Sequence, residues 1–427
     1  MAKKRDAFSL GAEAMVVTET CDDDSTADLQ LPAAGAQLDR AGYASQYTGK
    51  ACVYASATID GNGRPRQFAA HGYGDGDGGA STAFLPLDKM STDFVTPIDY
   101  EFIAFVAAQP GVLTVDGVGQ IELVGAGGGV YKARLSSSGP AGTKIESSVP
   151  VWATLESATT QEEQLFYGHN AGMNEDRRLH RLYVAQANGE AATVASIADG
   201  NEILKNGEPL GTFAAGELWQ GQVDSGDVFT AAGPIYGISR DGSHARVMVP
   251  GRLRGREFAV PNSRRSTAHL YVNCLESPCH VTVSTSDGVT NTEDIQAESF
   301  LEIVVTGAIG SDEAIVVSSS EPIVMAVSDG GGSIDYTPVP PVSTEVFGVA
   351  STVLSVATVG DNAMEISESC SEGSTATYQL PRMGGQMETD GYERQYTGKA
   401  CRLTSTTLVR KSSLCFAHSF SLKRMIC

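Results

Sequence analysis

Residues 14–52 read AMVVTETCDDDSTADLQLPAAGAQLDRAGYASQYTGKAC, and residues 363–401 read AMEISESCSEGSTATYQLPRMGGQMETDGYERQYTGKAC. The two stretches align without a gap, and about half of their positions are identical. Both keep two cysteines at the same separation, Cys21 with Cys52 and Cys370 with Cys401. A repeat of this quality indicates one long unit followed by the start of a second. We call residues 14–52 the first copy and residues 363–401 the second copy.

The long unit is itself divided by a recurring proline. Pro150, Pro234 and Pro322 lie roughly 85 residues apart, and each stands between two short apolar segments. Upstream of each proline, β-branched and aromatic residues alternate with polar ones, which is the period of a half-buried strand. Gly, Asp, Asn and Ser separate these segments, as turns require. The first module has QYTGKACVYAS (residues 46–56) where the others have their proline.

These patterns predict a row of β modules. The predicted order is a disordered N-terminus (1–11), a first module containing Cys21 and Cys52 (12–97), and three further modules (98–178, 179–261 and 262–361). Residues 362–407 then begin a second repeat of the first module. Residues 408–427 turn basic and stop resembling the first copy, so we expect a divergent, disordered tail. The repeated start suggests that the chain is a fragment of a longer array.

The predicted fold class is all-β, with tandem antiparallel modules of about four strands. A module of that size cannot bury both faces of its sheet alone. Packing side by side around an axis, like the four-stranded blades of a propeller, is the favoured arrangement. Tandem β-sandwich domains are the alternative, although a sandwich needs about seven strands per domain.

One part of the chain resembles a known family. The segments VSSSEPIVMAV (317–327), SIDYTPVPP (333–341) and EVFGVAS (345–351) are similar to the N-terminal domain of IgG Fc-binding proteins. The resemblance is clearest over residues 268–351, with echoes in the other modules. The family's Gly-Thr-Glu-Tyr strand is not intact in this chain. The resemblance implies extracellular binding rather than catalysis, and it does not imply that this chain binds IgG.

The cysteines give the strongest chemical signal. Each copy keeps both members of its pair, so we expect Cys21 to bond Cys52 and Cys370 to bond Cys401. Cys274 and Cys279 flank a turn between two predicted strands, where a bridge is geometrically reasonable. Three such pairs indicate an oxidising compartment, hence an extracellular or cell-surface protein. No secretion signal is visible at the N-terminus, and free cysteines in a cytosolic protein remain the alternative.

Acidic character sets the partners that we expect. The net charge of -21 predicts repulsion from nucleic acid, and no apolar run is long enough for membrane insertion. Acidic glycine-rich loops make Asp22, Asp23, Asp24, Asp75 and Asp77 weak calcium candidates, because calcium takes several oxygen ligands. Their closing glutamate is missing, and the second copy lacks the Asp cluster, so solvated turns and no cofactor are preferred. The expected partners are neighbouring repeats and an unidentified protein or glycan.

No catalytic residues can be assembled from the sequence. It has no phosphate-binding loop, no GxSxG and no HExxH, and its histidines have no readable partner. We therefore predict a non-enzymatic extracellular or cell-surface protein that binds or adheres. The alternatives are a hydrolase or lyase on a β-propeller and a structural component of a virion or fibre.

Overall fold

The computed structural model describes residues 81–343 except for gaps at 126–129, 159–162, 171–179, 243, 261–266, 286–287, 307–313 and 329–335. Outside that range it describes only the strands named below. The described part is nearly all strand, as predicted, with two short 3-10 turns, η1 (Leu87–Lys89) and η3 (Gly251–Leu253). Within the described residues, no helix is long and apolar enough to cross a membrane.

The second module shows the repeated topology most completely. Its strands are β9 (Ser91–Val95), β10 (Tyr100–Ala107), β11 (Gly111–Val115), β12 (Gly119–Gly125), β13 (Tyr131–Leu135), β14 (Lys144–Ser157) and β15 (Glu163–Leu165). The first half of β14 pairs with β9 and β11, and its second half pairs with β10 and β15. Pro150 lies between the two halves. Proline has no N–H for either ladder, so it suits the point at which a strand changes partners.

The third module repeats this plan. Its strands are β16 (Arg181–Tyr183), β17 (Asn188–Ser196), β18 (Asn201–Lys205), β19 (Glu208–Phe213), β20 (Leu218–Asp224), β21 (Val228–Ala231), β22 (Ile235–Asp241), β23 (His244–Val247) and β24 (Val249–Pro250). Here the long strand is split around Pro234 into β21 and β22. The strand β21 pairs with β16 and β18, while β22 pairs with β17 and β23.

The fourth module follows the same plan with an unbroken long strand. Its strands are β25 (Gly255–Val260), β26 (Thr267–Cys274), β27 (Cys279–Thr285), β28 (Gly288–Ile295), β29 (Phe300–Thr306), β30 (Ile315–Ser328) and β31 (Thr337–Val339). Before Pro322, β30 pairs with β25 and β27; after it, β30 pairs mainly with β26 and β31. The recurring proline therefore marks one structural event in all three modules.

The third module forms two separate sheets around an apolar core, whereas in the second module β10, β13, β12, β11 and β14 pair in a closed, barrel-like cycle. In the third module, Leu182 and Ile203 from one sheet pack with Val194 and Val223 from the other. All four side chains are nearly inaccessible to solvent. Each of these modules holds more strands than the roughly four expected from the sequence. Among the three, the third module has the two separate sheets of a β-sandwich, the alternative kept open above, and the second is closer to a small barrel.

The first module is built from both ends of the described chain. Its strands are β2 (Met15–Cys21), β3 (Thr26–Ala33), β5 (Ala51–Ser56), β6 (Phe68–Tyr73), β7 (Ser81–Ala83) and β8 (Leu85–Pro86), joined by β32 (Glu345–Val349) and β33 (Val353–Thr358). The strand β32 pairs with β5 and β8, and β33 pairs with β6. These pairings match those of β9 and β10 with β14, so β5 and β6 take the place of the long strand.

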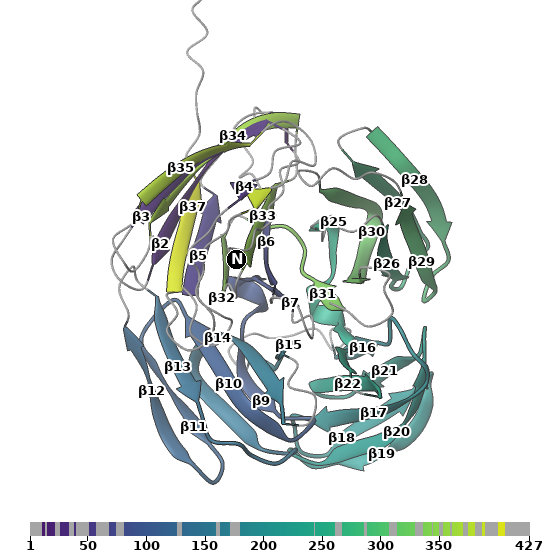
Figure 1. Ribbon diagram of the computed structural model, residues 1–427. Helices are drawn as coiled ribbons and strands as arrows, with labels where there is room; N and C mark the ends of the chain where they lie inside the picture. The colour runs from purple at the N-terminus through teal and green to yellow at the C-terminus, as the bar shows by residue number, and fades with distance from the viewer. Residues whose placement is uncertain are drawn as a thin grey trace, which may run out of the picture.

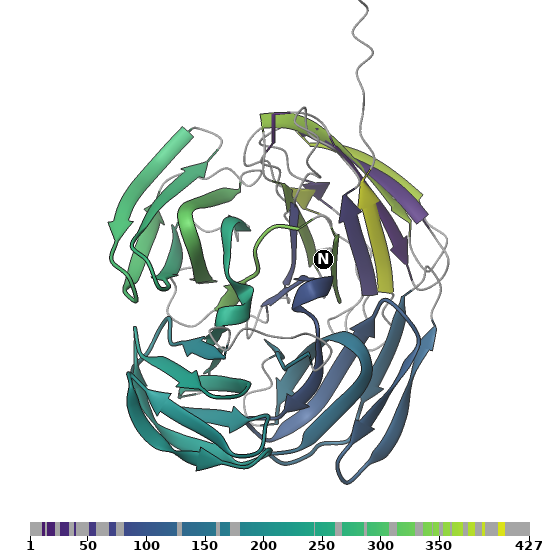
Figure 2. The same ribbon diagram turned by 180° about the vertical axis from the view of Figure 1, so that it is seen from behind.

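The four modules surround a common centre (Figures 1 and 2). One short strand from each module meets the others there: β7 contacts β15, β15 contacts β23, β23 contacts β31, and β31 contacts β7. Packing side by side around an axis is the arrangement that the sequence favoured. Because β32 and β33 follow the fourth module and complete the first, the described strands close the ring.

Further strands belong to the outer part of the first module. They are β1 (Gly11–Ala12), β4 (Leu38–Asp39), β34 (Asp361–Ser369), β35 (Thr375–Leu380), β36 (Met387–Glu388) and β37 (Ala400–Ser405). The strands β34, β35 and β37 come from the second copy and join the sheet that contains β2, β3 and β5. The predicted disordered segments 1–11 and 408–427 lie outside the described residues, apart from Gly11 in β1.

Candidate functional site at the centre of the ring

A buried arginine ties the connectors of two modules together at the centre. Arg252 lies in η3, which joins the third module to the fourth, and only 6% of it is exposed. Its guanidinium donates to Ser91 Oγ at 2.8 Å and to the carbonyl oxygen of Met90 at 3.0 Å. It also donates to the carbonyl oxygen of Gly168. A planar fork with several N–H donors can hold three acceptors at once, which a lysine cannot do.

Buried aromatic rings fill the space beside this arginine. The hydroxyl of Tyr236 donates to the carbonyl oxygen of Leu165 at 2.9 Å, and its ring lies 5.3 Å from that of Phe166. Burial raises the pKa of Tyr236 and of Tyr167 well above the ordinary phenol value. Both phenols therefore stay protonated at physiological pH, and the hydroxyl of Tyr236 acts as a hydrogen-bond donor rather than a base.

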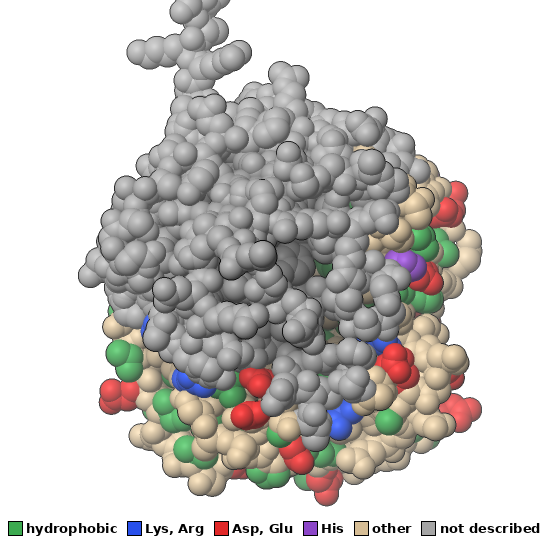
Figure 3. All heavy atoms as spheres, viewed as in Figure 1, with side chains coloured by type: hydrophobic (Ala, Val, Ile, Leu, Met, Phe, Trp, Pro, Cys, Tyr) green, Lys and Arg blue, Asp and Glu red, His purple; other side chains and the backbone are tan. Residues whose placement is uncertain are grey.

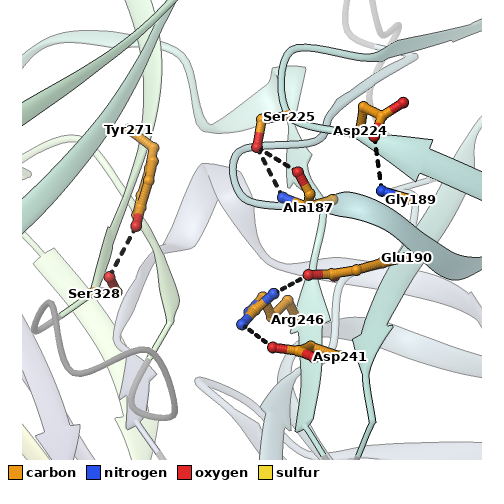
Figure 4. Close-up of polar contacts among 9 residues, drawn as sticks. All are labelled: Ala187, Gly189, Glu190, Asp224, Ser225, Asp241, Arg246, Tyr271 and Ser328. Atoms are coloured by element: carbon orange, nitrogen blue, oxygen red, sulfur yellow. Dashed lines mark hydrogen bonds and ion pairs between the residues drawn. The ribbon is translucent and has the colours of Figure 1, made fainter.

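A charged cluster lies in the third module, on the side that faces the fourth module (Figure 4). Arg246 of β23 is 7% exposed and reaches across β22 to pair with Glu190 of β17. Its other terminal nitrogen lies 3.0 Å from Asp241 Oδ2. Glu190 is largely buried while Asp241 is exposed, so one arginine joins an inner carboxylate to an outer one. Losing the arginine would leave a buried carboxylate unpaired, which is strongly unfavourable.

The start of β17 is held by a tight turn that presents Glu190 (Figure 4). Ala187 N donates to Ser225 Oγ at 2.8 Å, and that hydroxyl donates back to the Ala187 carbonyl at 2.9 Å. Gly189 N donates to Asp224 Oδ1 at 2.7 Å. These contacts fix the backbone on both sides of residue 188 and so help to position Glu190 for its ion pair with Arg246.

Tyrosines of the fourth module face this cluster. Tyr271 of β26 shares a 3.1 Å hydrogen bond with Ser328 of β30 (Figure 4). Tyr336, just before β31, packs with Tyr271 at 6.1 Å between ring centroids. Burial, more than any other influence, raises the pKa of Tyr336; Tyr271 and Glu190 also raise it, and Arg246 and a hydrogen bond with the backbone of Ala185 oppose them. The boundary between the third and fourth modules thus combines an apolar core with buried polar groups from both.

A separate acidic pair lies on the second module. Glu156 of β14 is half-buried, and its pKa is raised to about 7 by burial first and then by the neighbouring Glu101, while Arg134 opposes the shift. Arg134 also lies over the ring of Phe102, 4.4 Å from its centroid. Glu156 therefore changes charge near neutral pH, which an isolated glutamate does not do.

The polar contacts at the centre join elements of different modules. Among the described residues there, polar side chains bond to backbone carbonyls, to serine hydroxyls or to opposite charges. Within the same described residues, no three His, Cys, Asp or Glu side chains are close enough to hold a metal ion. The centre is best understood as the lock that fixes the modules relative to one another.

The structure describes only some of the predicted site residues. Cys274 and Cys279 form a disulfide across the β26–β27 hairpin, with their Cα atoms 5.9 Å apart. Both are buried. Cys21, Cys52 and Cys401 lie on β2, β5 and β37, where only their backbone placement is described. Cys370 and the calcium candidates Asp22, Asp23, Asp24, Asp75 and Asp77 lie outside the described residues.

The central residues were not singled out from the sequence. Arg246 does leave a signal there, because it is a lone arginine beside apolar residues in the run ARVMVP (245–250), whereas Arg252 is followed closely by Arg254 and Arg256. An arginine in such a run is expected to be buried and paired. Glu190 leaves no such signal, because it follows a turn and looks like an ordinary surface residue.

Comparison with known proteins adds little. No family model and no curated protein matches the chain. Among solved structures, a biofilm-associated protein BSP domain is 8% identical, covers 89% of this chain and 97% of its own, and has a TM-score of 0.15. An anti-sigma factor domain-containing protein from Clostridium clariflavum is 9% identical, covers 64% and 99%, and has a TM-score of 0.13. Scores this low carry no argument about fold or function.

Proposed function

We propose that this chain is a non-enzymatic binding or adhesion protein of the cell surface or extracellular space. Its propeller-like ring of β modules would serve as a rigid scaffold, and its ligand would be a protein or a glycan held on the outer surface. The proposal rests above all on one observation, the buried disulfide between Cys274 and Cys279.

A buried disulfide indicates that the protein folds in an oxidising compartment. Stable disulfides form in oxidising environments and are rare in the cytosol. The Cys274–Cys279 bridge closes a short hairpin loop, Leu275 to Pro278, and both sulfur-bearing residues are shielded from solvent. The recurrence of two cysteines in each copy of the repeat supports the same reading.

The charge of the surface indicates which classes of ligand are favoured. Figure 3 shows acidic side chains at several separate points of the described face, with few basic ones between them. Together with the net charge of -21, this disfavours anionic polymers and favours neutral or basic partners. The exposed large apolar side chains among the described residues lie apart, on η1 (Leu87), on the turn after β11 (Val118), on β12 (Val124) and on β29 (Val304), so a broad apolar docking face is not indicated there.

The resemblance of residues 268–351 to the N-terminal domain of IgG Fc-binding proteins supports a binding role. It concerns the strand around Pro322, the element that changes partners in all three proline-containing modules. The resemblance therefore concerns the type of module, and it does not indicate which ligand the chain binds.

Two measurements test the proposal. The first is thiol counting on native protein with and without reductant, combined with peptide mapping under non-reducing conditions. We expect Cys274 and Cys279 to be unreactive until reductant is added; free thiols at both positions in native protein would remove the main support. The second is binding to glycan and protein arrays at two salt concentrations. Retained binding by the protein at physiological salt is expected, and turnover of array substrates would favour an enzyme instead.

A further inference from the structure

The first module contains two equivalent sets of strands, one from the first copy and one from the second copy, where one set would complete its fold. The strands β2, β3 and β5 come from the first copy, and their counterparts in the second copy are β34, β35 and β37. The first copy completes the ring, because β5 pairs with β32 in the way that β14 pairs with β9. The second copy is therefore surplus to the ring, although it carries the same strand-forming sequence.

Strand β2 pairs with either copy in one register. It pairs with its own β5 with Thr18 opposite Ala55, and in the same antiparallel register Thr20 would face Val53. In the structure Thr20 faces Arg402 of β37 instead. Arg402 is the second-copy counterpart of Val53. The strand β37 thus takes over the partner of β5 without a shift of even one residue.

Strand β3 behaves in the same way. Gln30 faces Val16 within the first copy, and it also faces Glu365 of β34. Glu365 is the second-copy counterpart of Val16. Some other positions of this pairing are shifted by a bulge, but this register is kept at Ala27 as well, which faces Glu19 and its counterpart Glu368. A one-residue slip would turn every side chain to the other face, so a kept register indicates matched surfaces.

We propose that the two copies are interchangeable partners through which chains join head to tail, the first copy of one chain pairing with the second copy of another. The second copy follows β33 after residues 359 and 360 only, so it stays with its own ring. The first copy is joined to β6 through residues 57–67, which extend to at most about 40 Å. It has the reach to pair outside its own ring while its place there is taken by β34, β35 and β37.

Such pairing is heterologous, because it joins two different surfaces, so it gives a closed ring or an open chain according to the rotation between molecules. Heterologous contacts that do not close a ring generate open chains of molecules. Pairing within one chain benefits from a high effective concentration, so it dominates in dilute solution. Crowding at a surface, or any high local concentration, shifts the balance towards pairing between chains. The inference concerns assembly and holds whether or not the binding function proposed above is right.

The disulfide bonds that form show whether each copy pairs with itself or with the other copy. Within each copy, the expected bridges are Cys21–Cys52 and Cys370–Cys401. In the shared register, however, Cys401 lies opposite Cys21 and also beside Cys52. Exchange between copies therefore gives a different set, with Cys21 linked to Cys401.

Isotope mixing separates pairing within a chain from pairing between chains. Unlabelled and ¹⁵N-labelled full-length chains are reduced, unfolded, mixed at high concentration and refolded together in a glutathione redox buffer. After alkylation and digestion without reduction, we expect peptides that join an unlabelled Cys21 to a labelled Cys401. Bridges within the copies alone, or Cys21–Cys401 peptides of one isotope only, would overturn the proposal.

Light scattering on proline variants gives an independent test. Arg402 pairs with Thr20 of β2, so Arg402→Pro removes an N–H from β37 and leaves the first copy untouched. We expect wild-type protein to exceed its single-chain mass of 44.7 kDa as concentration rises, and Arg402→Pro to stay near that mass. Leu408→Pro, beyond the end of β37, is the matched control and should behave as wild type. A wild type that remains a single chain at every concentration, or an Arg402→Pro variant that assembles normally, contradicts the proposal.

Discussion

Trp152 of β14 donates a hydrogen bond from Nε1 to the carbonyl oxygen of Ala83 in β7, 2.8 Å away. Both residues are fully buried. The bond joins the second module to β7 of the first module, at the centre where the four modules meet. One side chain therefore both fills the core of its own module and fixes the position of its neighbour.

Replacing this tryptophan should weaken the ring. Trp152→Phe removes the donor and leaves the Ala83 carbonyl buried without its partner, which costs about 1–3 kcal/mol beyond the change in packing. The matched control is Trp219→Phe, at the only other tryptophan, whose partly buried ring packs on Phe229 at 5.1 Å. Urea unfolding of both variants measures the difference, and each keeps one tryptophan as a fluorescent reporter. Equal losses in the two variants would mean that the bond to Ala83 contributes nothing.

The fork of Arg252 should not tolerate a lysine. In Arg252→Lys the charge is kept, but one ammonium cannot reach Ser91 Oγ and the carbonyls of Met90 and Gly168 together. Bonds to a charged group are each worth about 1.5–3 kcal/mol, so a loss of more than about 2 kcal/mol in unfolding free energy is expected.

The control for Arg252 is the same substitution four residues later. Arg256 is exposed and pairs with Glu321 at 2.8 Å. Exposed ion pairs contribute about 0–1 kcal/mol, so Arg256→Lys should be close to neutral. Thermal and chemical unfolding of the two variants in parallel decides the matter; a tolerated Arg252→Lys would show that the central arginine is not a structural lock.

The raised pKa of Glu156 predicts a loss of stability on the alkaline side. An unfolded glutamate titrates near 4.5 and the folded one near 7, so the folded state holds the extra proton between these values. The stabilising contribution is complete below about pH 4.5 and is lost as pH rises towards and through 7. Glu156→Gln, which cannot ionise, should therefore flatten the fall in stability between pH 5 and 8.

Glu122→Gln is the control for this pH experiment, because Glu122 is an exposed residue of β12 in the same module. Melting temperature is measured at half-unit steps from pH 4 to pH 8.5 for wild type and both variants. Identical slopes for wild type and Glu156→Gln would show that folding does not raise the pKa of Glu156.

The hairpin disulfide should stabilise the fourth module modestly. Replacing both Cys274 and Cys279 with Ala avoids burying new hydroxyl groups, since both positions are inaccessible to solvent. Closing so short a loop is worth about 2 kcal/mol in the chain-entropy estimate, so a loss of that order is expected. Addition of reductant should lower the melting temperature of the wild type and leave the double variant less affected. No response of the wild type to reductant would mean that the bridge does not form in solution.

Much of the module can be predicted from local sequence. Alternation of apolar and polar residues marks the strands, and Pro150, Pro234 and Pro322 mark where each long strand changes partners. The hairpin position of Cys274 and Cys279 also follows from the short turn between them. These features depend on neighbours along the chain, and so the sequence alone can show them.

The partners of the long strand could not be predicted from the same pattern, because the choice of partners for its two halves depends on residues distant in sequence. The sequence predicted two short strands around Pro150, whereas Lys144–Ser157 is one strand that pairs with four others.

The sequence by itself determined that the chain is β-rich, modular and repeated, because periodicity, turn residues and the doubled stretch are local properties. Only the tertiary structure decided that β32 and β33 complete the first module, that Arg252 locks connectors from different modules, and that Glu156 titrates near neutrality. Each of these depends on burial and on contacts between residues far apart in the chain. Hydrogen-bond partners and solvent exclusion are set by the packed whole, and no short stretch of sequence encodes them.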